Sequence, residues 1–213
     1  MFEGKMSRRD ALLLAAAATA AAPTLALRWE DQDFDDSVAL GGASLVLNGV
    51  GKRAGGIWRA YVAGLYVSAK SNTAAGLLAL PGPKRLQIRI TLDVSKSLPM
   101  GLPAIDAKEF VKAVDKGVAR NCTEAERAAL GERLSQFTAN LQSVGKVRKR
   151  DVINIDYLPD KGTLLNVNGK SFGAPVPGAD LYNAFLKVFL GDQPFDAKLK
   201  TGLMGGMMGE AAK

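Results

Sequence analysis

Hydrophobic and polar residues alternate over residues 84–94, and this period predicts a β-strand with one buried face. Leu86, Ile88 and Ile90 share the apolar face, while charged and polar residues occupy the other. Lys84 opens the segment and belongs to the apolar face by parity. We therefore expect Lys84 at the end of a row of core side chains.

A second strand is predicted over residues 57–68, where Tyr61 shares the inward parity and Tyr66 points to the opposite face. The dipeptide Asn48-Gly49 precedes it and is typical of a hairpin turn, so we expect the chain to reverse there. This places Arg53 just ahead of the strand that carries Tyr61.

Helical periodicity replaces the alternation in the middle of the chain. One stripe, over residues 107–118, includes Phe110, and a second runs over residues 130–141. The second helix is expected to begin at a capping box formed by Thr123 and Glu126. Shorter helices are predicted at residues 73–80 and 178–190.

Strands return at residues 151–158, 163–167 and 170–172, joined by short glycine-containing turns. Because short turns connect the strands, we expect an antiparallel sheet with helices packed on one face, an α+β fold. The glycine- and methionine-rich end of the chain is expected to be disordered. We therefore assign a single domain to residues 27–205 and a flexible tail to residues 206–213.

The first 26 residues have the layout of an export signal. Paired arginines, Arg8 and Arg9, precede an apolar, alanine-rich run and suggest the twin-arginine route, although the general secretory route stays open. Cleavage near Ala26 would release the mature protein into the periplasm. An uncleaved anchor is the alternative, but the apolar run is short for a bilayer span.

Composition narrows the possible chemistry. The 213-residue chain has no histidine and a single cysteine, Cys122, which excludes a histidine-based triad, a zinc site of the usual kind and an intrachain disulfide. We expect no metal and no cofactor, and we interpret Cys122 as a buried, inert thiol. The net charge is +7, yet the basic run at residues 146–150 lacks interleaved aromatics, so we expect a solvated loop rather than a nucleic-acid site.

Arg53 and Tyr61 are the best candidates for a binding site. A guanidinium stays charged in proteins and requires an anionic partner when it lies beside a half-buried strand. A tyrosine hydroxyl on that strand can share the same anion. Together, the pair predicts a carboxylate-binding site.

The chain resembles the chalcone isomerase-like family in its exported bacterial branch. Four segments together carry this resemblance: NGVGKR (48–53), YVAGLYV (61–67), DVINIDYLPDKGTLLNVNGK (151–170) and PGADLYNAFLKVFLGDQPFDAKLKTGLMG (177–205). The resemblance covers residues 34–205. It implies an antiparallel sheet layered with helices and a ligand cleft between the layers. This layout agrees with the one that the periodicity predicts.

The family contains isomerases that close a chalcone into a flavanone, and non-catalytic relatives that bind fatty acids. By this resemblance, Arg53 and Lys84 match the arginine and lysine of the isomerases, and the threonine position falls on Tyr61. The helix that should supply a tyrosine and an asparagine contains no tyrosine, and its asparagine, Asn121, lies at the far end. Losing such members of a cooperating network favours binding over catalysis.

We therefore expect a periplasmic, non-catalytic protein that binds an amphipathic carboxylate such as a fatty acid, and that meets a membrane only during export. Arg53, Tyr61 and Lys84 would contact the head group, and apolar side chains would cover the tail: Leu86, Ile88, Ile90 and Phe110. An intramolecular lyase that uses Arg53, Tyr61 and Lys84 on a chalcone-like substrate is one alternative. An exported scaffold or interaction protein is another, and the oligomeric state is left open.

Overall fold

The computed structural model describes residues 26–29, 32–53, 61–91 and 104–206, and its centre is an antiparallel seven-stranded sheet. The strands lie side by side in the order β11-β10-β9-β6-β5-β4-β3. Their bounds are β3 (Ser37–Leu40), β4 (Ala43–Lys52), β5 (Tyr61–Val67), β6 (Lys84–Ile90), β9 (Val152–Leu158), β10 (Gly162–Val167) and β11 (Lys170–Ser171).

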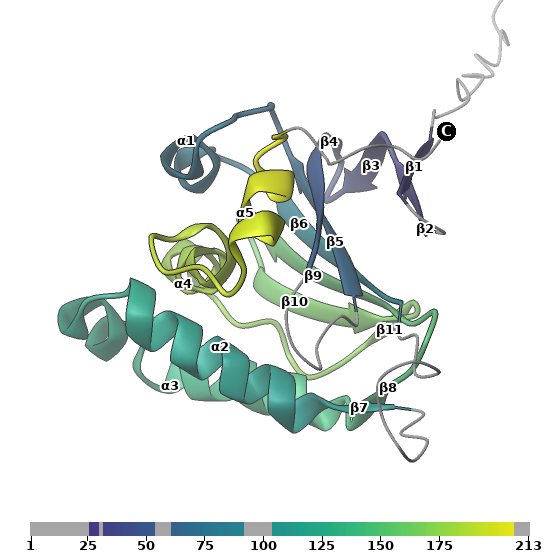
Figure 1. Cartoon of the computed structure of the whole chain (residues 1–213). Coiled ribbons are helices and arrows are strands. Elements are labelled where there is room, and N and C mark those ends of the chain that lie inside the picture. The colour runs from purple at the N-terminus through teal and green to yellow at the C-terminus, as the bar shows by residue number, and fades with distance from the viewer. Residues whose placement is uncertain (1–25, 30–31, 54–60, 92–103, 207–213) are drawn as a thin grey trace, which may run out of the picture.

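Helices cover one face of this sheet (Figure 1). They are α1 (Ala74–Ala79), α2 (Ala107–Asn121), α3 (Glu124–Ser143), α4 (Ala179–Leu190) and α5 (Ala197–Leu203). The expected capping box at the start of α3 is present, because the Thr123 side chain accepts from the Glu126 backbone and the Glu126 side chain accepts from Thr123. The fold thus confirms the predicted α+β class.

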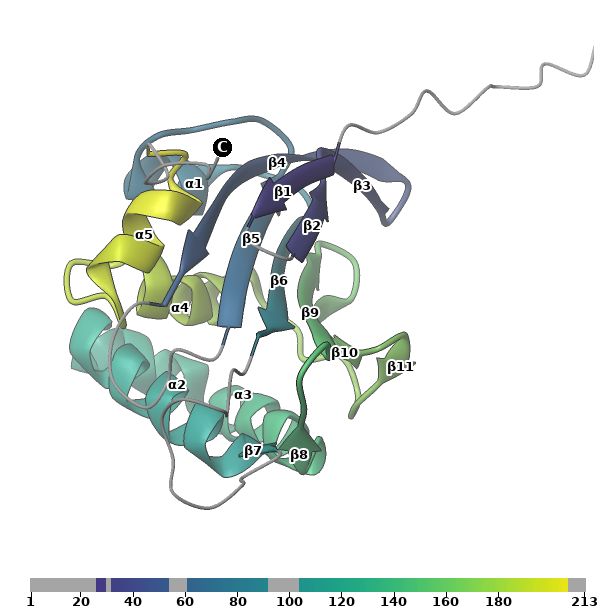
Figure 2. The ribbon, with the colours of Figure 1, turned by 45° about the vertical axis from the view of Figure 1, so that its right-hand side comes forward.

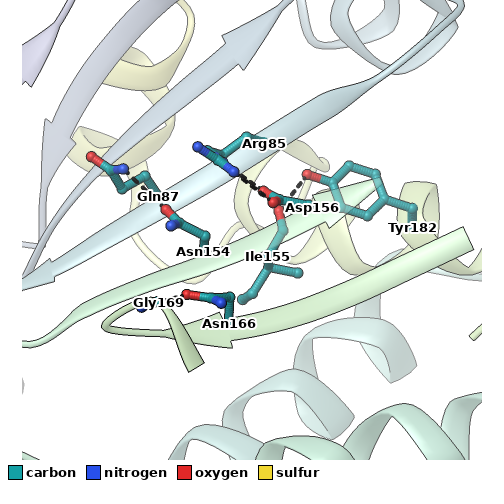
Figure 3. Close-up of polar contacts among 8 residues, drawn as sticks. All are labelled: Arg85, Gln87, Asn154, Ile155, Asp156, Asn166, Gly169 and Tyr182. Carbon is teal, nitrogen blue, oxygen red and sulfur yellow. Dashed lines mark hydrogen bonds and ion pairs between the residues drawn. The ribbon is translucent and has the colours of Figure 1, made fainter. Parts of the chain in front are cut away.

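The sheet consists of two antiparallel meanders that meet where β6 pairs with β9 (Figure 3). Arg85 and Asp156 face each other across this seam and form a bidentate ion pair with two N–O distances of 2.7 Å. Gln87 Nε2 donates to Asn154 Oδ1 at 3.0 Å two pairs further along, on the same face. Direct cross-strand pairs of this kind fix the register of a sheet.

The second face of the sheet has a smaller apolar cluster of its own. A separate ribbon of β1 (Ala26–Trp29) and β2 (Gln32–Asp35) lies across this face (Figure 2). The side chains that form the cluster alternate with those of the main core: Phe34, Leu45, Leu47, Val50, Val62 and Tyr66. Tyr66 is therefore on the face opposite Tyr61, as strand parity predicts.

The turn expected at Asn48-Gly49 is wrong, because both residues lie inside β4, at a bulge in its pairing with β5. Asn48 Nδ2 donates to the carbonyl of Leu203 at 2.7 Å, and its Oδ1 accepts from the backbone of Ser71 at 2.8 Å. A Cβ on Gly49 would collide with the backbone of Gly202 in α5. The asparagine-glycine pair serves close packing of a helix rather than chain reversal.

Helix α5 itself was not predicted from the periodicity, and it shows that part of the glycine-rich end is ordered. Leu199 and Leu203 are fully buried against the sheet.

Strand residues 57–60 and 92–94, the leader over residues 1–25 and tail residues 207–213 lie outside the described residues. No helix in the described part of the chain has both the length and the apolar character to cross a bilayer.

Candidate functional site

A cavity of about 210 Å³ lies between the helix-covered face of the sheet and helix α2. The sheet contributes β5, β6, β9, β10 and Arg53, which follows β4. The other walls come from α2, the end of α3, the loop before α5, and the small pair of strands β7 (Ile105–Asp106) and β8 (Lys146–Val147). The lining residues are Arg53, Tyr61, Ile88, Ile90, Ile105, Asp106, Ala107, Glu109, Phe110, Lys112, Ala113, Lys116, Leu141, Val144, Val147, Ile153, Leu165 and Phe195.

The sheet wall is an aliphatic row that runs across the strands. Tyr61 on β5 is paired with Ile90 on β6, Ile88 is paired with Ile153 on β9, and Leu165 follows on β10. Neighbouring strands are about 4.8 Å apart, so the row from β5 to β10 extends about 14 Å. The apolar wall of the cavity therefore extends across four strands of the sheet.

The polar end of the cavity is formed where β4 and β5 meet. Arg53 follows β4, and its backbone N–H donates to the carbonyl of Tyr61 at 3.4 Å. The guanidinium lies over the ring of Phe195, with Cζ 3.7 Å from the ring centroid. Asp196, which follows Phe195 and caps α5 by accepting from the Lys198 and Leu199 backbones, also acts on Arg53 electrostatically. Arg53 thus stacks on a ring, and the charge of Asp196 favours its cationic form.

Burial determines the protonation of Tyr61. Desolvation raises the pKa of Tyr61 above its ordinary value, and the positive charge of Arg53 offsets this rise only in part. Desolvation also lowers the pKa of Arg53, while Tyr61 and Asp196 raise it, and a guanidinium remains charged in either case. The buried Tyr61 hydroxyl therefore remains protonated beside a cation and can act as a hydrogen-bond donor.

Charged side chains from α2 stand along the cavity as well. Asp106, Lys112 and Lys116 are exposed, and Glu109 is partly buried. Lys112 Nζ and Glu109 Oε1 are 2.9 Å apart, one helical turn from each other on α2. The apolar interior therefore has a charged border on its solvent side.

The structure brings Arg53, Tyr61, Ile88, Ile90 and Phe110 to one cavity, as the sequence analysis expects. Their role in ligand binding stays a prediction. Phe110 comes from the first turn of α2 and packs against the main core.

Lys84 and Leu86 are not among the lining residues, and this corrects their expected place. Lys84 shares the inward parity but lies six positions before Ile90, which is about 20 Å along a strand. Its Nζ donates to the carbonyl of Leu78 in α1 at 3.3 Å, and burial lowers the pKa of the amine. Leu86 is fully buried between Leu65 and Ile155 in the core.

Sequence reasoning missed Phe195, the residue on which the Arg53 guanidinium stacks. Phe195 lies in the loop between α4 and α5, where the hydrophobic pattern has neither the helical nor the strand period. Its backbone N–H donates to the carbonyl of Val188 in α4 at 2.8 Å. The one available indication was that residues 177–205 belong to the segments that resemble the family.

Asn121 and Cys122, which the sequence analysis also singles out, are not among the residues that line the cavity. Asn121 donates to the carbonyls of Gly117 and Gln193, each at 2.9 Å, and so ties the end of α2 to the loop before α5. Cys122 is buried, and burial raises the pKa of its thiol, so it is a poor nucleophile. The described residues contain no group of histidine, cysteine and acidic side chains able to hold a metal.

Fold and cavity together define an α+β protein that encloses a small apolar site with one cationic end, between an antiparallel sheet and its covering helices. The chain belongs to the chalcone isomerase-like family, which it matches over residues 26–205. It is also similar to the crystal structure of a fatty-acid binding protein from Arabidopsis thaliana, with a TM-score of 0.60 and 14% identity over 84% of this chain and 96% of that one. A likeness at this identity shows the fold. No curated protein matches the sequence.

Proposed function

We propose that this protein binds an amphipathic carboxylate, such as a fatty acid, without transforming it. The observation that carries the proposal is the meeting of Arg53 and Tyr61 at one end of a cavity that is otherwise mainly aliphatic inside. The guanidinium and the hydroxyl supply charge-assisted hydrogen bonds to the head group. The aliphatic row of the sheet covers the tail, with Phe110 opposite on α2.

The composition of the lining supports binding over ring closure. Among the described lining residues Tyr61 has the only hydroxyl, and α2 contributes apolar side chains (Ala107, Phe110, Ala113) and charged ones (Glu109, Lys112, Lys116) but neither a tyrosine nor an asparagine. Stabilising an enolate as charge develops requires several preorganised donors. A cation with a single hydroxyl suits a static carboxylate better than a developing oxyanion.

We further propose that the protein works in the periplasm after removal of its leader. The paired arginines, the alanine-rich run and the small residues before Ala26 support this location. The similar Arabidopsis protein is named for fatty-acid binding, which supports a ligand of the same chemical class here.

Calorimetric titration with dodecanoate and with its methyl ester tests the proposal. A hydrogen bond to a charged group contributes about 1.5–3 kcal/mol, so Arg53→Met should weaken dodecanoate binding roughly 10- to 150-fold. Because the Tyr61 hydroxyl donates to the same charged carboxylate, Tyr61→Phe should weaken binding by a similar factor of roughly 10 to 150. The methyl ester carries no charge, so its affinity should respond little to Arg53→Met.

Tyr66→Phe is the matched control. Tyr66 and Tyr61 both lie in β5 and both have buried hydroxyls, but Tyr66 points into the second apolar cluster. The control should bind dodecanoate as the wild type does. Wild-type protein that binds neither ligand, and that yields no small molecule on extraction from periplasmic material, would overturn the proposal.

A further inference from the structure

Basic side chains gather on the edge of the molecule that borders the cavity. We call Lys146, Arg148, Lys149 and Arg150 the basic edge. All four are exposed, and none makes an ion pair with another residue that the structure describes. Their charges are therefore directed to an external partner or to solvent.

The basic edge is fixed to the wall of the cavity by backbone hydrogen bonds. Arg150 donates to the carbonyl of Ile90 at 2.9 Å, and Ile90 donates back to Asp151 at 3.0 Å. Val147 in β8 is paired with Ile105 in β7. Because Ile90, Ile105 and Val147 all line the cavity, the basic edge cannot lie far from its interior.

Hydrogen bonds to Asp151 hold the turn that carries these charges in a defined conformation. Arg150 has a φ of 75°, a conformation that a non-glycine residue rarely adopts. Asp151 holds this turn, since its Oδ2 accepts from the Arg148 backbone at 2.6 Å and its Oδ1 accepts from Asn168 at 2.8 Å. A disfavoured backbone that neighbouring groups enforce points to a specific use of the residues it displays.

Helix α2 adds positive charge beside the same cavity. Lys112 and Lys116 are exposed lining residues, of which Lys112 is balanced by Glu109. Among the described residues, Asp106, which is paired with Lys146 across β7 and β8, and Asp151 are the other acids on this side, and they are outnumbered by the basic residues. No aromatic side chain stands between the basic residues of the edge, which leaves nothing for bases to stack on.

We propose that the basic edge docks the protein onto an anionic lipid surface, beside which the cavity takes up or releases its ligand. Clusters of lysine and arginine are attracted to anionic headgroups without a specific pocket. Only the uptake of ligand rests on the proposed function, since docking itself requires the charges alone. This differs from the expectation that the protein meets a membrane only during export.

Vesicle flotation tests the docking. The probe is vesicles of phosphatidylcholine alone, or with about a third phosphatidylglycerol, at low and high salt. Wild-type protein should float only with the anionic vesicles and should be released by salt. Each basic residue near such a surface favours binding about fivefold, so the variant Arg148→Gln, Lys149→Gln, Arg150→Gln should partition roughly a hundredfold more weakly.

A matched variant, Lys70→Gln, Arg120→Gln, Arg127→Gln, loses the same charge from exposed positions away from the cavity lining and should float nearly as the wild type does. Equal loss in both variants, binding to pure phosphatidylcholine, or tighter binding to duplex DNA than to the anionic vesicles would overturn the proposal. Arg53→Met should keep vesicle binding, and the basic-edge variant should keep its affinity for dodecanoate. Failure of docking and failure of ligand binding are thereby distinguished.

Discussion

Replacing Phe195 by leucine tests whether the stacked ring holds Arg53 ready for a carboxylate. The guanidinium lies 3.7 Å above the ring centroid, well inside the range in which a cation is attracted to an aromatic face. Leucine keeps an apolar side chain at the cavity wall but has no ring. Arg53 should then sample more orientations, and binding must restrict them again.

The expected magnitude follows from the partial burial of this contact. Cation–aromatic contacts contribute about 0.5–1 kcal/mol when exposed and about 2 kcal/mol when desolvated. Arg53 is partly buried, so about 1–2 kcal/mol is reasonable, which corresponds to roughly a 5- to 30-fold weaker affinity for dodecanoate. The affinity for the methyl ester should change little, because the ester does not engage the guanidinium.

A double-mutant cycle separates this positioning role from direct contact between the ring and the ligand. In the Arg53→Met background, Phe195→Leu should have almost no effect on the dissociation constant of dodecanoate. If Phe195→Leu weakens dodecanoate equally with and without Arg53, the ring contacts the tail and the reasoning is refuted. Thermal unfolding of each variant checks that the fold is intact.

Three predictions concern stability, and urea unfolding measures each of them. Burial lowers the pKa of the Lys84 amine in the folded protein below its ordinary value of 10.5. Between these two pKa values the unfolded chain binds more protons than the folded protein does, so the free energy of unfolding rises with pH. Lys84→Met should abolish that rise and stabilise the protein at neutral pH; an unchanged pH dependence would contradict this. Gly51→Ala should destabilise by about 1–3 kcal/mol through overpacking, because the new carbon would lie 2.5 Å from the carbonyl oxygen of Leu199; wild-type stability would show that α5 moves away freely. A hydrogen bond from Arg133 lowers the pKa of Asp180, so their ion pair stabilises the fold above the ordinary carboxyl pKa and loses its effect as pH falls through the lowered value. Since Asp180 is 51% exposed, Asp180→Asn should destabilise by less than about 1 kcal/mol at neutral pH and by nothing in acid; a larger or pH-independent loss would point to another role.

Strand periodicity predicted the inner wall of the cavity because parity is a local property. Ile88, Ile90 and Tyr61 face the helices, and Tyr66 does not, as alternation alone requires. Parity gives the face of a sheet but not the position along it. Lys84 shows the limit, since it has the correct face and lies at the wrong end of β6.

The conformation at Asn48-Gly49 and the contact between Phe195 and Arg53 depend on segments that are distant in the sequence. Asn48-Gly49 has the composition of a turn, but α5 requires a glycine for close approach and an amide to bond Leu203. Tertiary packing therefore overrode the local preference. Phe195 meets Arg53 only because α5 packs on β4, and no period in the sequence records that contact.

The seam between β6 and β9 has a consequence for how this protein assembles. Gln87 and Asn154 bond across it although 67 positions separate them, so its closure carries a large loop entropy and should come late in folding. The cavity takes walls from both meanders and exists only once they have joined. A ligand that contacts both meanders would stabilise their association. At a ligand concentration a hundred times its dissociation constant, the free energy of global unfolding would rise by about 2.7 kcal/mol. Ligand binding and the folding of the domain are thus thermodynamically linked.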